Sequence, residues 1–429
     1  MKHSSKRSLV AFAIVAALAA PSAYATDGYF SHGYSMKEQG MGGAGVAYPQ
    51  DSLAAATNPA GMVLIGNRVD VGLTWFRPNR SATITGNQLP PGYPNANGTY
   101  DGNGKSNFFI PEFGYNHMLN PNMSLGVSVY GNGGMDTHYT QPIPLLGTTD
   151  PGVDLSQLIV APTFAMKVNP KNAIGISLNL AYQRFAATGL QNFTCTSGPG
   201  CPSGPPSSSP SNVTNNGYDS STGWGVRIGW VGQITPIVSL GATYQTKTYM
   251  GKFNKYKGLF AGQGSFDIPA NYALGVAVKA TPKTVLALDV ERILYGGVPA
   301  IANSGANQAQ LGSNNGPGFG WRNVTVVKVG IAQKVTPNLT LRAGYNHSDN
   351  PIPATQTFFN ILAPGVVKDH MTLGATWKTA PNQELTFAYM HAFSNTVNGS
   401  NSIPPTAGGG NANISLSENS FGVAYGWKF

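Results

Sequence analysis

The sequence predicts an all-β fold, a fourteen-stranded antiparallel β-barrel. Three observations predict it: an export signal with no later helical anchor, fourteen stretches in which apolar and polar residues alternate, and breaks between them that are short and long in strict alternation. Alternation with a period of two is typical of a strand whose two faces meet different surroundings.

The first 25 residues are typical of a secretory signal peptide. Basic residues at positions 2, 6 and 7 precede an apolar run over 9–20, and Ala23-Tyr24-Ala25 offers a cleavage site of small residues. This run is too short to span a membrane, and no later stretch reaches the roughly 18 to 20 apolar residues that a spanning helix needs. We therefore expect export, removal of 1–25, and a mature chain of about 404 residues.

The predicted strands all lie after residue 66. In the first, Val71, Leu73 and Trp75 share one face, while Asp70 and Gly72 share the other. The fourteen alternating stretches are 69–75, 109–115, 123–129, 158–168, 174–182, 224–230, 238–244, 272–278, 286–290, 327–331, 339–345, 371–377, 385–389 and 421–429. We expect residues 67–429 to form one barrel domain.

The breaks between these stretches are of two kinds. Six short ones contain a proline that presets φ for a tight turn: 120–122, 169–171, 235–237, 281–283, 336–338 and 380–382. Seven long ones are predicted loops: 78–106, 131–154, 187–220, 251–267, 296–320, 350–367 and 394–415. Six turns that alternate with seven loops require fourteen strands with both chain ends on the short-turn side.

Short turns on one side, long loops on the other and an even strand number are typical of a multi-pass β-barrel of the bacterial outer membrane. Only 10% of the residues are charged, against about 25% in soluble domains, which suits a surface that meets lipid. A secreted β-sandwich or propeller is the soluble alternative. Strands of ten or more residues without a blade repeat disfavour it.

The face opposite the apolar one carries the charged residues of the strands and is predicted to line the lumen. A charge on the lipid face would cost roughly 2–4 kcal/mol near the midplane, so this sorting supports the barrel. The lumenal charges are Asp70, Glu112, Arg227, Lys247, Asp289, Glu291, Lys328 and Arg342. Each could serve the lumen wall, an ion pair to a plug, or a ligand.

The segment 26–66, between the signal peptide and the first strand, is predicted to be a hatch. Four glycines, at positions 40, 42, 43 and 45, crowd six residues, so this backbone can approach other backbone closely. Fourteen strands enclose a lumen too wide to be filled by the side chains of the wall alone. The N-terminal segment is the available filler on the short-turn side.

Cysteine usage and charge add little about function. Cys195 and Cys201 lie in a Gly/Pro/Ser-rich stretch of an exported chain, so we expect a local disulfide rather than a metal site or reactive thiol. Without the signal, 23 basic residues face 17 acidic ones, an excess of +6 with no basic stripe. No nucleic-acid partner is therefore expected.

The chain resembles the FadL/TodX family of outer-membrane transporters for long-chain fatty acids and other hydrophobic compounds. The resemblance rests on the Gly-rich 40–45, the tripeptide Asn58-Pro59-Ala60, the fourteen-strand pattern and the C-terminal Phe429. It implies a hatch in the barrel, an apolar ligand pocket, and passive uptake with lateral exit through a gap in the wall. A terminal aromatic is also an assembly signal, so the outer-membrane assembly machinery is an expected partner of Phe429.

The resemblance places the gap at a kink in the third strand. The matching residues are Tyr130, Gly131, Gly133 and Gly134, whose glycines could instead simply begin a loop. The tripeptide Asn58-Pro59-Ala60 is the predicted hinge of the hatch.

Six residues are candidate ligand contacts: Tyr29, Phe30, Arg227, Lys247, Lys328 and Arg342. The first two could imitate an apolar ligand at the tip of the hatch, and the four cations, chosen by parity, could hold a carboxylate. Fatty acids and neutral aromatic or aliphatic hydrocarbons both remain candidate substrates.

Two other functions were weighed. An outer-membrane lipid-modifying enzyme is disfavoured because the sequence has no G-x-S-x-G, H-x-H or H-E-x-x-H motif, so we expect no catalytic residue, metal or cofactor. A general polar porin is the second alternative, and conductance would separate it from a plugged transporter. We further expect a monomer surrounded by lipid and lipopolysaccharide.

Overall fold

The computed structural model describes residues 26–196 and 205–429. The predicted signal peptide, 1–25, lies outside the described residues, and so does Cys201, with which Cys195 is predicted to pair. Within the described ranges, no helix is long and apolar enough to cross a membrane.

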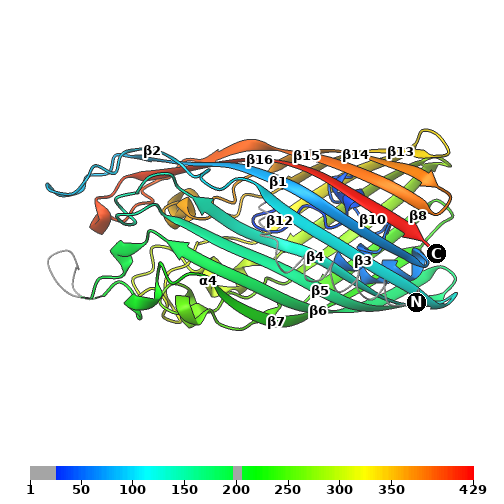
Figure 1. The fold of residues 1–429 in the computed structure, drawn as a ribbon, viewed down its shortest axis with the longest axis horizontal. Coiled ribbons are helices and arrows are strands. Elements are labelled where there is room, and N and C mark those ends of the chain that lie inside the picture. The colour runs from blue at the N-terminus through cyan, green and yellow to red at the C-terminus, as the bar shows by residue number, and fades with distance from the viewer. Residues whose placement is uncertain (1–25, 197–204) are drawn as a thin grey trace, which may run out of the picture.

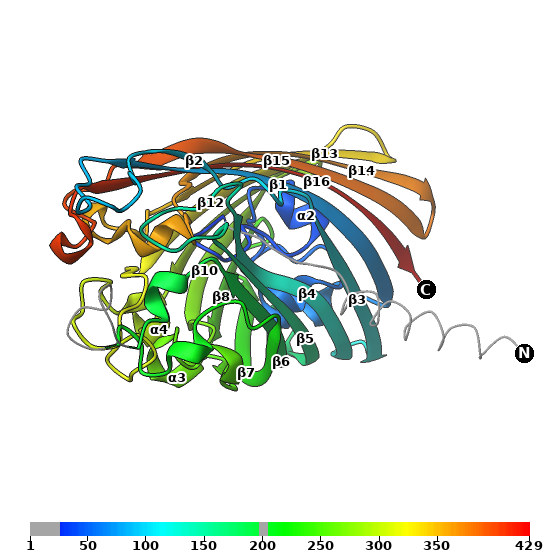
Figure 2. The same ribbon diagram turned by 60° about the vertical axis from the view of Figure 1, so that its left-hand side comes forward.

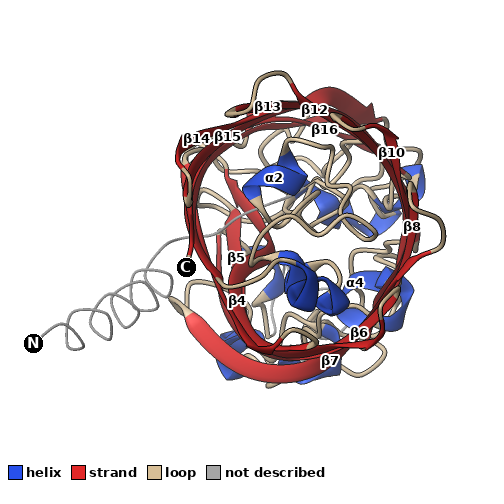
Figure 3. Ribbon diagram, turned by 90° about the vertical axis from the view of Figure 1, so that its right-hand side faces the viewer, coloured by secondary structure: helices blue, strands red, loops and turns tan. Residues whose placement is uncertain are grey.

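Fourteen strands in the described ranges form one closed antiparallel barrel (Figures 1 and 3). Neighbours in sequence are neighbours in the sheet, and β16 pairs with β1 to close it. The barrel strands are β1 (Arg68–Thr85), β3 (Phe108–Asn120), β4 (Met123–His138), β5 (Gly152–Asn169), β6 (Asn172–Thr188), β7 (Asp219–Gln233), β8 (Val238–Gln245), β10 (Asn271–Thr281), β11 (Thr284–Ile293), β12 (Val324–Lys334), β13 (Leu339–Ser348), β14 (Asp369–Ala380), β15 (Gln383–Val397) and β16 (Asn411–Lys428). The short β2 (Gly98–Asp101) pairs with β1, and β9 (Tyr249–Met250) pairs with β7.

The predicted strand count and all six short turns are confirmed, but several predicted loop bounds are wrong. The predicted loop 78–106 begins too early, because β1 continues to Thr85 and pairs with β16 as far as Asn411. The predicted loop 131–154 is likewise strand up to His138 and again from Gly152. Backbone pairing continues beyond the apolar band, so the hydrophobic pattern ends before the strands do.

The two faces of the wall divide as the alternation predicts. Along β1, Val71, Leu73 and Trp75 are exposed on the outer face, and the even-numbered residues between them are buried. Of the eight predicted lumenal charges, Lys247 and Glu291 are half-buried and the other six are buried. The polarity of the barrel, lipid outside and charge inside, follows.

Helices are short and lie inside the barrel or among the long loops (Figure 2). The α-helices are α2 (Met36–Gln39), α3 (Ala261–Gly264) and α4 (Pro299–Ala302). The 3₁₀ helices are η1 (Ala54–Ala56), η2 (Pro59–Leu64), η3 (Gln191–Phe193), η4 (Pro210–Asn212), η5 (Asn254–Tyr256), η6 (Tyr295–Gly297), η7 (Ala354–Gln356), η8 (Phe359–Ile361) and η9 (Pro405–Ala407). Figure 3, along the barrel axis, shows α2 within the ring of strands.

The Gly-rich part of the N-terminal segment lies against the wall because its glycines permit close approach. Gly40 faces Gly374 of β14 so closely that an added Cβ would meet its Cα at 2.9 Å. Gly42 has φ of 66° and would bring a Cβ to 2.7 Å from the carbonyl oxygen of Tyr345. A side chain at Gly42 would therefore strain the backbone and also separate the segment from β13.

Candidate functional site

Wall carboxylates hold the segment 31–66 by accepting its backbone amides. Asp289 of β11 accepts from Gly45 N at 2.7 Å and from Val46 N at 2.9 Å. Asp70 of β1 accepts from Ser52 N at 2.9 Å. Hydrogen bonds to a charged group are stronger than neutral ones, about 1.5–3 kcal/mol each. These lumenal charges therefore fasten the segment to the wall.

Ion pairs complete this attachment. Arg68 bonds Asp70 through Nε at 2.8 Å and Nη2 at 2.5 Å, and its Nη2 also lies 2.7 Å from Glu384 Oε1. Lys37 of the N-terminal segment pairs with the same Glu384 carboxylate. The segment thus contributes a cation to an ion-pair network whose other members lie on the wall strands β1 and β15.

The tripeptide Asn58-Pro59-Ala60 is fixed between the segment and the wall. Asn58 Oδ1 accepts from Ala60 N at 3.1 Å and caps η2, while its Nδ2 donates to Trp230 O at 2.9 Å. On the wall, a Cβ at Gly229 would lie 1.9 Å from Asn58 Oδ1. All three residues are buried, so these contacts favour an anchor over the predicted hinge, because a hinge must be free to change its backbone angles.

The first residues of the segment, Thr26–Phe30, are held mainly by aromatic packing. Tyr29 and Phe30 are fully buried, with ring centroids 5.5 and 5.9 Å from that of Tyr295. Trp321 lies 6.1 Å from the Tyr29 ring. Polar contacts add to this packing: Tyr295 Oη bonds Tyr29 N at 3.2 Å and the carbonyl of Asp27, and Asp27 Oδ2 lies 3.3 Å from Asn346 Nδ2 and 3.9 Å from Lys328 Nζ.

Burial shifts the pKa values of three groups in the segment. It raises the pKa of Asp27 to about 6, against the opposing effect of Lys328, whose Nζ lies 3.9 Å away. It raises the pKa of Glu38 to about 8, helped by Asp51 nearby. Burial, with His370 next in effect, lowers the pKa of His32 to about 3. Glu38 and His32 are therefore neutral at pH 7.

The wall has an unpaired stretch between β3 and β4, which we call the seam. The two strands pair from Asn120↔Met123 up to Phe113↔Val129 and no further, although both continue. Beyond that point the strand that pairs with β4 is β5, with a register shift between Gly131 and Gly133, and isolated bridges join β4 to Phe30 and Asn103. The glycine run therefore lies inside a strand and beside a β-bulge, an arrangement that bends a strand.

The seam ends at the long-loop side of the barrel, and the N-terminal segment covers it from the lumen. At its upper end, Asn103 pairs with His138, and Gly104 N donates to His138 O at 2.9 Å. From the lumen, Tyr29 O accepts from Gly134 N, and Ser31 N donates to Asn132 O, each at 3.2 Å. The N-terminal segment therefore forms backbone hydrogen bonds with β4 at the seam.

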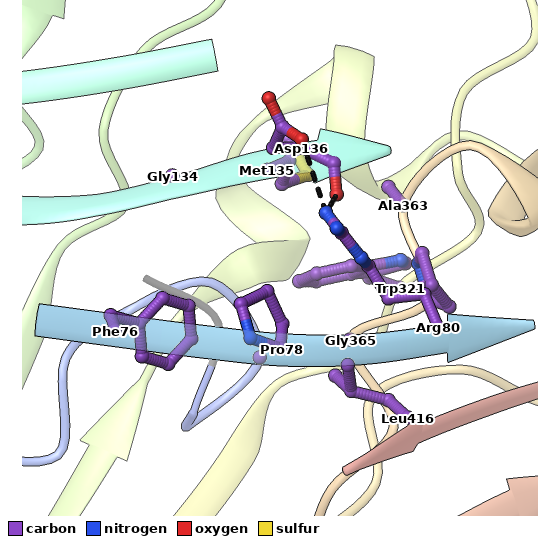
Figure 4. A pocket seen from close by; sticks show the side chains of 12 residues that line it. Phe76, Pro78, Arg80, Gly134, Met135, Asp136, Trp321, Ala363, Gly365 and Leu416 are labelled. Carbon is purple, nitrogen blue, oxygen red and sulfur yellow. Dashed lines mark hydrogen bonds and ion pairs between the residues drawn. The ribbon is translucent and has the colours of Figure 1, made fainter. Parts of the chain in front are cut away.

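A small cavity of about 20 Å³, the central cavity, adjoins the seam (Figure 4). Its lining residues come from β1, β4, β16, two long loops and the N-terminal segment: Gly28, Phe76, Pro78, Arg80, Gly134, Met135, Asp136, Trp321, Ala363, Pro364, Gly365 and Leu416. The side chains are apolar except Arg80 and Asp136, which form an ion pair at 3.1 Å.

A second cavity of about 40 Å³, the loop cavity, lies at the long-loop end. Its lining is entirely apolar: Val153, Phe185, Leu190, Phe193, Leu259, Phe260, Ala300, Leu311, Pro317, Gly318, Phe319, Phe359 and Leu362. Leu362 lines the loop cavity, and the next three residues, 363–365, line the central cavity. The two cavities are therefore neighbours.

The structure separates the predicted ligand residues. Arg227 and Lys328 line a third, polar cavity under the segment, where Asp289 and Glu291 also lie. Lys247 pairs with Asp267 at 3.2 Å. Arg342 bonds Gln50 at 3.1 Å and Thr376 at 2.7 Å. Tyr29 packs beside Trp321 and Phe30 beside Tyr295, whereas none of the four predicted cations lines the central cavity.

Sequence reasoning missed Arg80, Asp136 and Trp321. Arg80 and Asp136 fell inside predicted loops. Arg80 shares the even-numbered, buried face of β1 with Asp70, so extending the alternation past Pro78 would have found it. Trp321 lies in the loop before β12, and no sequence pattern indicated its place beside Tyr295.

A closed fourteen-stranded barrel with charged lumen and apolar exterior defines an outer-membrane β-barrel protein. Residues 18–429 match the family described as outer membrane protein transport protein (OMPP1/FadL/TodX), and the chain belongs to this family. A search of curated proteins found no match.

Solved structures share this fold. The toluene transporter TodX of P. putida is 19% identical with a TM-score of 0.67, and the match covers 93% of this chain and 99% of that one. A Pseudomonas aeruginosa FadL homologue is 17% identical with a TM-score of 0.70, over 94% of this chain and 100% of that one. The Ralstonia pickettii toluene transporter TbuX is 18% identical with a TM-score of 0.64, over 93% and 99%. The protein is thus a multi-pass outer-membrane transport protein.

Proposed function

We propose that the protein admits small hydrophobic compounds passively through the outer membrane. The compound would pass from the loop cavity to the central cavity and leave through the seam into the bilayer. The observation that carries this proposal is the position of the central cavity, which is lined both by Gly28 of the N-terminal segment and by residues 134–136 of β4 beside the seam.

The physical case concerns solvent. Exposing the surface of an apolar solute to water costs roughly 25 cal/mol per Å², so a path between apolar surfaces keeps this free-energy cost low. Both cavities are lined mainly by apolar side chains, and the seam is an unpaired stretch of the barrel wall between β3 and β4. Two structural relatives are toluene transporters, which supports a hydrophobic substrate for this chain.

In this proposal 26–66 is a hatch whose tip moves. The tip, Thr26–Phe30, bonds to β4 at the seam and lies beside the central cavity, so a ligand that replaces its aromatic contacts would favour a displaced tip. The anchored part, 31–66, would stay in place and keep the lumen closed. A polar porin is disfavoured because the described lumen holds this segment rather than an open channel.

The remaining predicted partners are part of the proposal. Phe429 is 47% exposed at the short-turn end and stacks on Tyr115, with ring centroids 5.9 Å apart, so it is accessible to an assembly factor. We propose a monomer whose apolar exterior meets lipid and lipopolysaccharide directly. Membership of a transport family, and not the lack of a motif, is what disfavours an enzyme.

Deleting Thr26–Phe30 tests the role of the tip. We expect uptake of a labelled hydrocarbon by cells that express the protein to change at least fivefold, while conductance in planar bilayers stays low because the anchored part remains. A matched deletion of the exposed loop residues 306–309 should leave uptake as in the wild type. Unchanged uptake after removal of the tip would contradict the proposal.

Deleting Asn132 tests lateral exit. This residue is the extra one at the register shift in β4, and its removal should let β4 continue regular pairing and close the seam. We expect a folded barrel, judged by heat-modifiable migration in electrophoresis, that no longer takes up the hydrocarbon. Normal uptake by such a barrel would exclude exit through the seam.

A further inference from the structure

Resting on the proposed function, we infer that the central cavity selects uncharged hydrophobic ligands over carboxylates, with Asp136 as the residue that sets this preference. The inference depends on how the one cation of the cavity lining is already occupied.

Arg80 has little capacity left for a ligand. The residue is 2% exposed; its Nη1 donates to Asp136 Oδ1 at 3.1 Å and also to the Asp136 carbonyl, and its Nη2 donates to the Lys105 carbonyl. Among the described residues its Nε alone has no hydrogen-bond partner. A carboxylate ligand could not bind this guanidinium in the favoured two-bond geometry unless it displaced Asp136.

The charges around the cavity are also matched. Lys105, the other nearby cation, pairs with Asp136 at 3.3 Å and with Asp154. Thus two cations face two carboxylates, and neither cation is spare.

A third carboxyl group, Glu418, lies near the cavity and supplies no cation for a ligand. It lies on the lumenal face of β16, two residues from Leu416 and opposite Pro78, both of which line the cavity. The side chain is fully buried, and neither carboxyl oxygen has a hydrogen-bond partner in the described ranges. A fully buried carboxyl group without a partner is uncharged, so it does not attract an anionic ligand, whereas a neutral apolar ligand would meet an apolar wall.

The cations chosen by parity do not change this balance. Lys328 bonds Glu291 at 2.8 Å, and Lys247 pairs with Asp267 at 3.2 Å. Neither lines the central cavity. The selectivity therefore comes from ion pairing within the lumen and not from a lack of basic residues.

The test uses toluene and benzoate, which have similar shape and differ in charge at pH 7. Binding to the purified protein is measured by calorimetry, and uptake is measured with labelled compounds in cells. For the wild type we expect benzoate to bind at least tenfold more weakly than toluene. Asp136→Asn frees Arg80, so the benzoate-to-toluene affinity ratio should rise at least tenfold. The control Asp267→Asn removes an ion pair elsewhere and should leave the ratio unchanged.

Two further variants complete the test. Glu418→Gln keeps the shape of an uncharged carboxyl group and should leave the ratio unchanged. Adding Arg80→Gln to Asp136→Asn should abolish the gain. Equal binding of both ligands by the wild type, or an unchanged ratio in a folded Asp136→Asn barrel, would overturn the selectivity. If the wild type takes up neither compound, the transport proposal itself fails.

Discussion

The two ends of the N-terminal segment are held in the lumen by different forces. The anchored part, 31–66, is joined to the wall by carboxylates that accept backbone amides and by the network of Lys37, Arg68 and Glu384. The tip, Thr26–Phe30, is held by aromatic rings packed against Tyr295 and Trp321, and its one ion pair in the described ranges, Asp27 with Lys328, is long at 3.9 Å.

This difference separates what a hydrophobic ligand can replace from what it cannot. Apolar contacts are not directional, so another apolar molecule can substitute for the tip at small cost. Buried ion pairs have no such substitute, because removing one partner leaves an uncompensated charge. The segment thus combines a fixed part with an exchangeable end, and three changes test the contrast.

Removing a wall carboxylate from the anchored part should have the largest effect. Asp70→Ala leaves the buried Arg68 with Glu384 as its one carboxylate partner among the described residues and leaves Ser52 N without its acceptor, so we expect the free energy of unfolding to fall by about 3 kcal/mol. Denaturant titration of the purified barrel measures this loss, and bilayer recordings should show new conductance as the segment loosens.

The control for Asp70→Ala is Asp349→Ala, which removes a surface ion pair to Arg292 at 3.8 Å. Exposed pairs contribute at most about 1 kcal/mol, so this change should be small. An equal loss in both variants would mean that the lumenal carboxylates do not anchor the segment.

An intermediate effect is expected from pH. The pKa of Glu38 is raised from 4.5 to about 8, so its contribution to stability is complete below pH 4.5 and is lost as pH rises to 8. His32, lowered from 6.5 to about 3, acts oppositely and loses its contribution only as pH falls below 6.5. Asp27, whose pKa is raised from 3.8 to about 6, is already mostly ionised at pH 6.5.

Between pH 6.5 and 8, Glu38 is therefore the titrating group of these three. Glu38→Gln, which keeps the neutral shape, should abolish a loss of up to about 2 kcal/mol in this window, measured by denaturant titration at several pH values. Asp150→Asn on an exposed loop is the matched control. A wild-type stability that does not fall over this range would contradict the assignment.

The smallest effect on stability is expected at the tip. Phe30→Leu keeps an apolar side chain but loses edge-to-face contacts with Tyr29 and Tyr295, at a cost of about 1 kcal/mol. The thermal midpoint should fall slightly while conductance stays low. Phe393→Leu, at an exposed position, serves as the control. A loss as large as that of Asp70→Ala would remove the contrast between tip and anchor.

Much of the barrel could be predicted because its signals are local. The proline in each short break marks the turns, which gives the number of strands and the side on which the turns lie. The alternation of residues such as Asp70 and Leu73 shows which face of each strand is lumenal and which is outward. The ends of the strands could not be predicted. Beyond the membrane the strands still pair through their backbones, but their outer face need not be apolar, so the alternating pattern disappears. Asp136 was therefore expected in a loop and lies in β4.

By itself the sequence determined the barrel, its fourteen strands and its polarity, since each depends on residues one or two positions apart. Only the tertiary structure decided the seam and the pairing of Arg80 with Asp136. It also decided the fit of Asn58 against Gly229. These features join residues from distant parts of the chain. Their geometry depends on the register of the closed sheet and on the path of the segment within it, and neither is encoded in a local pattern.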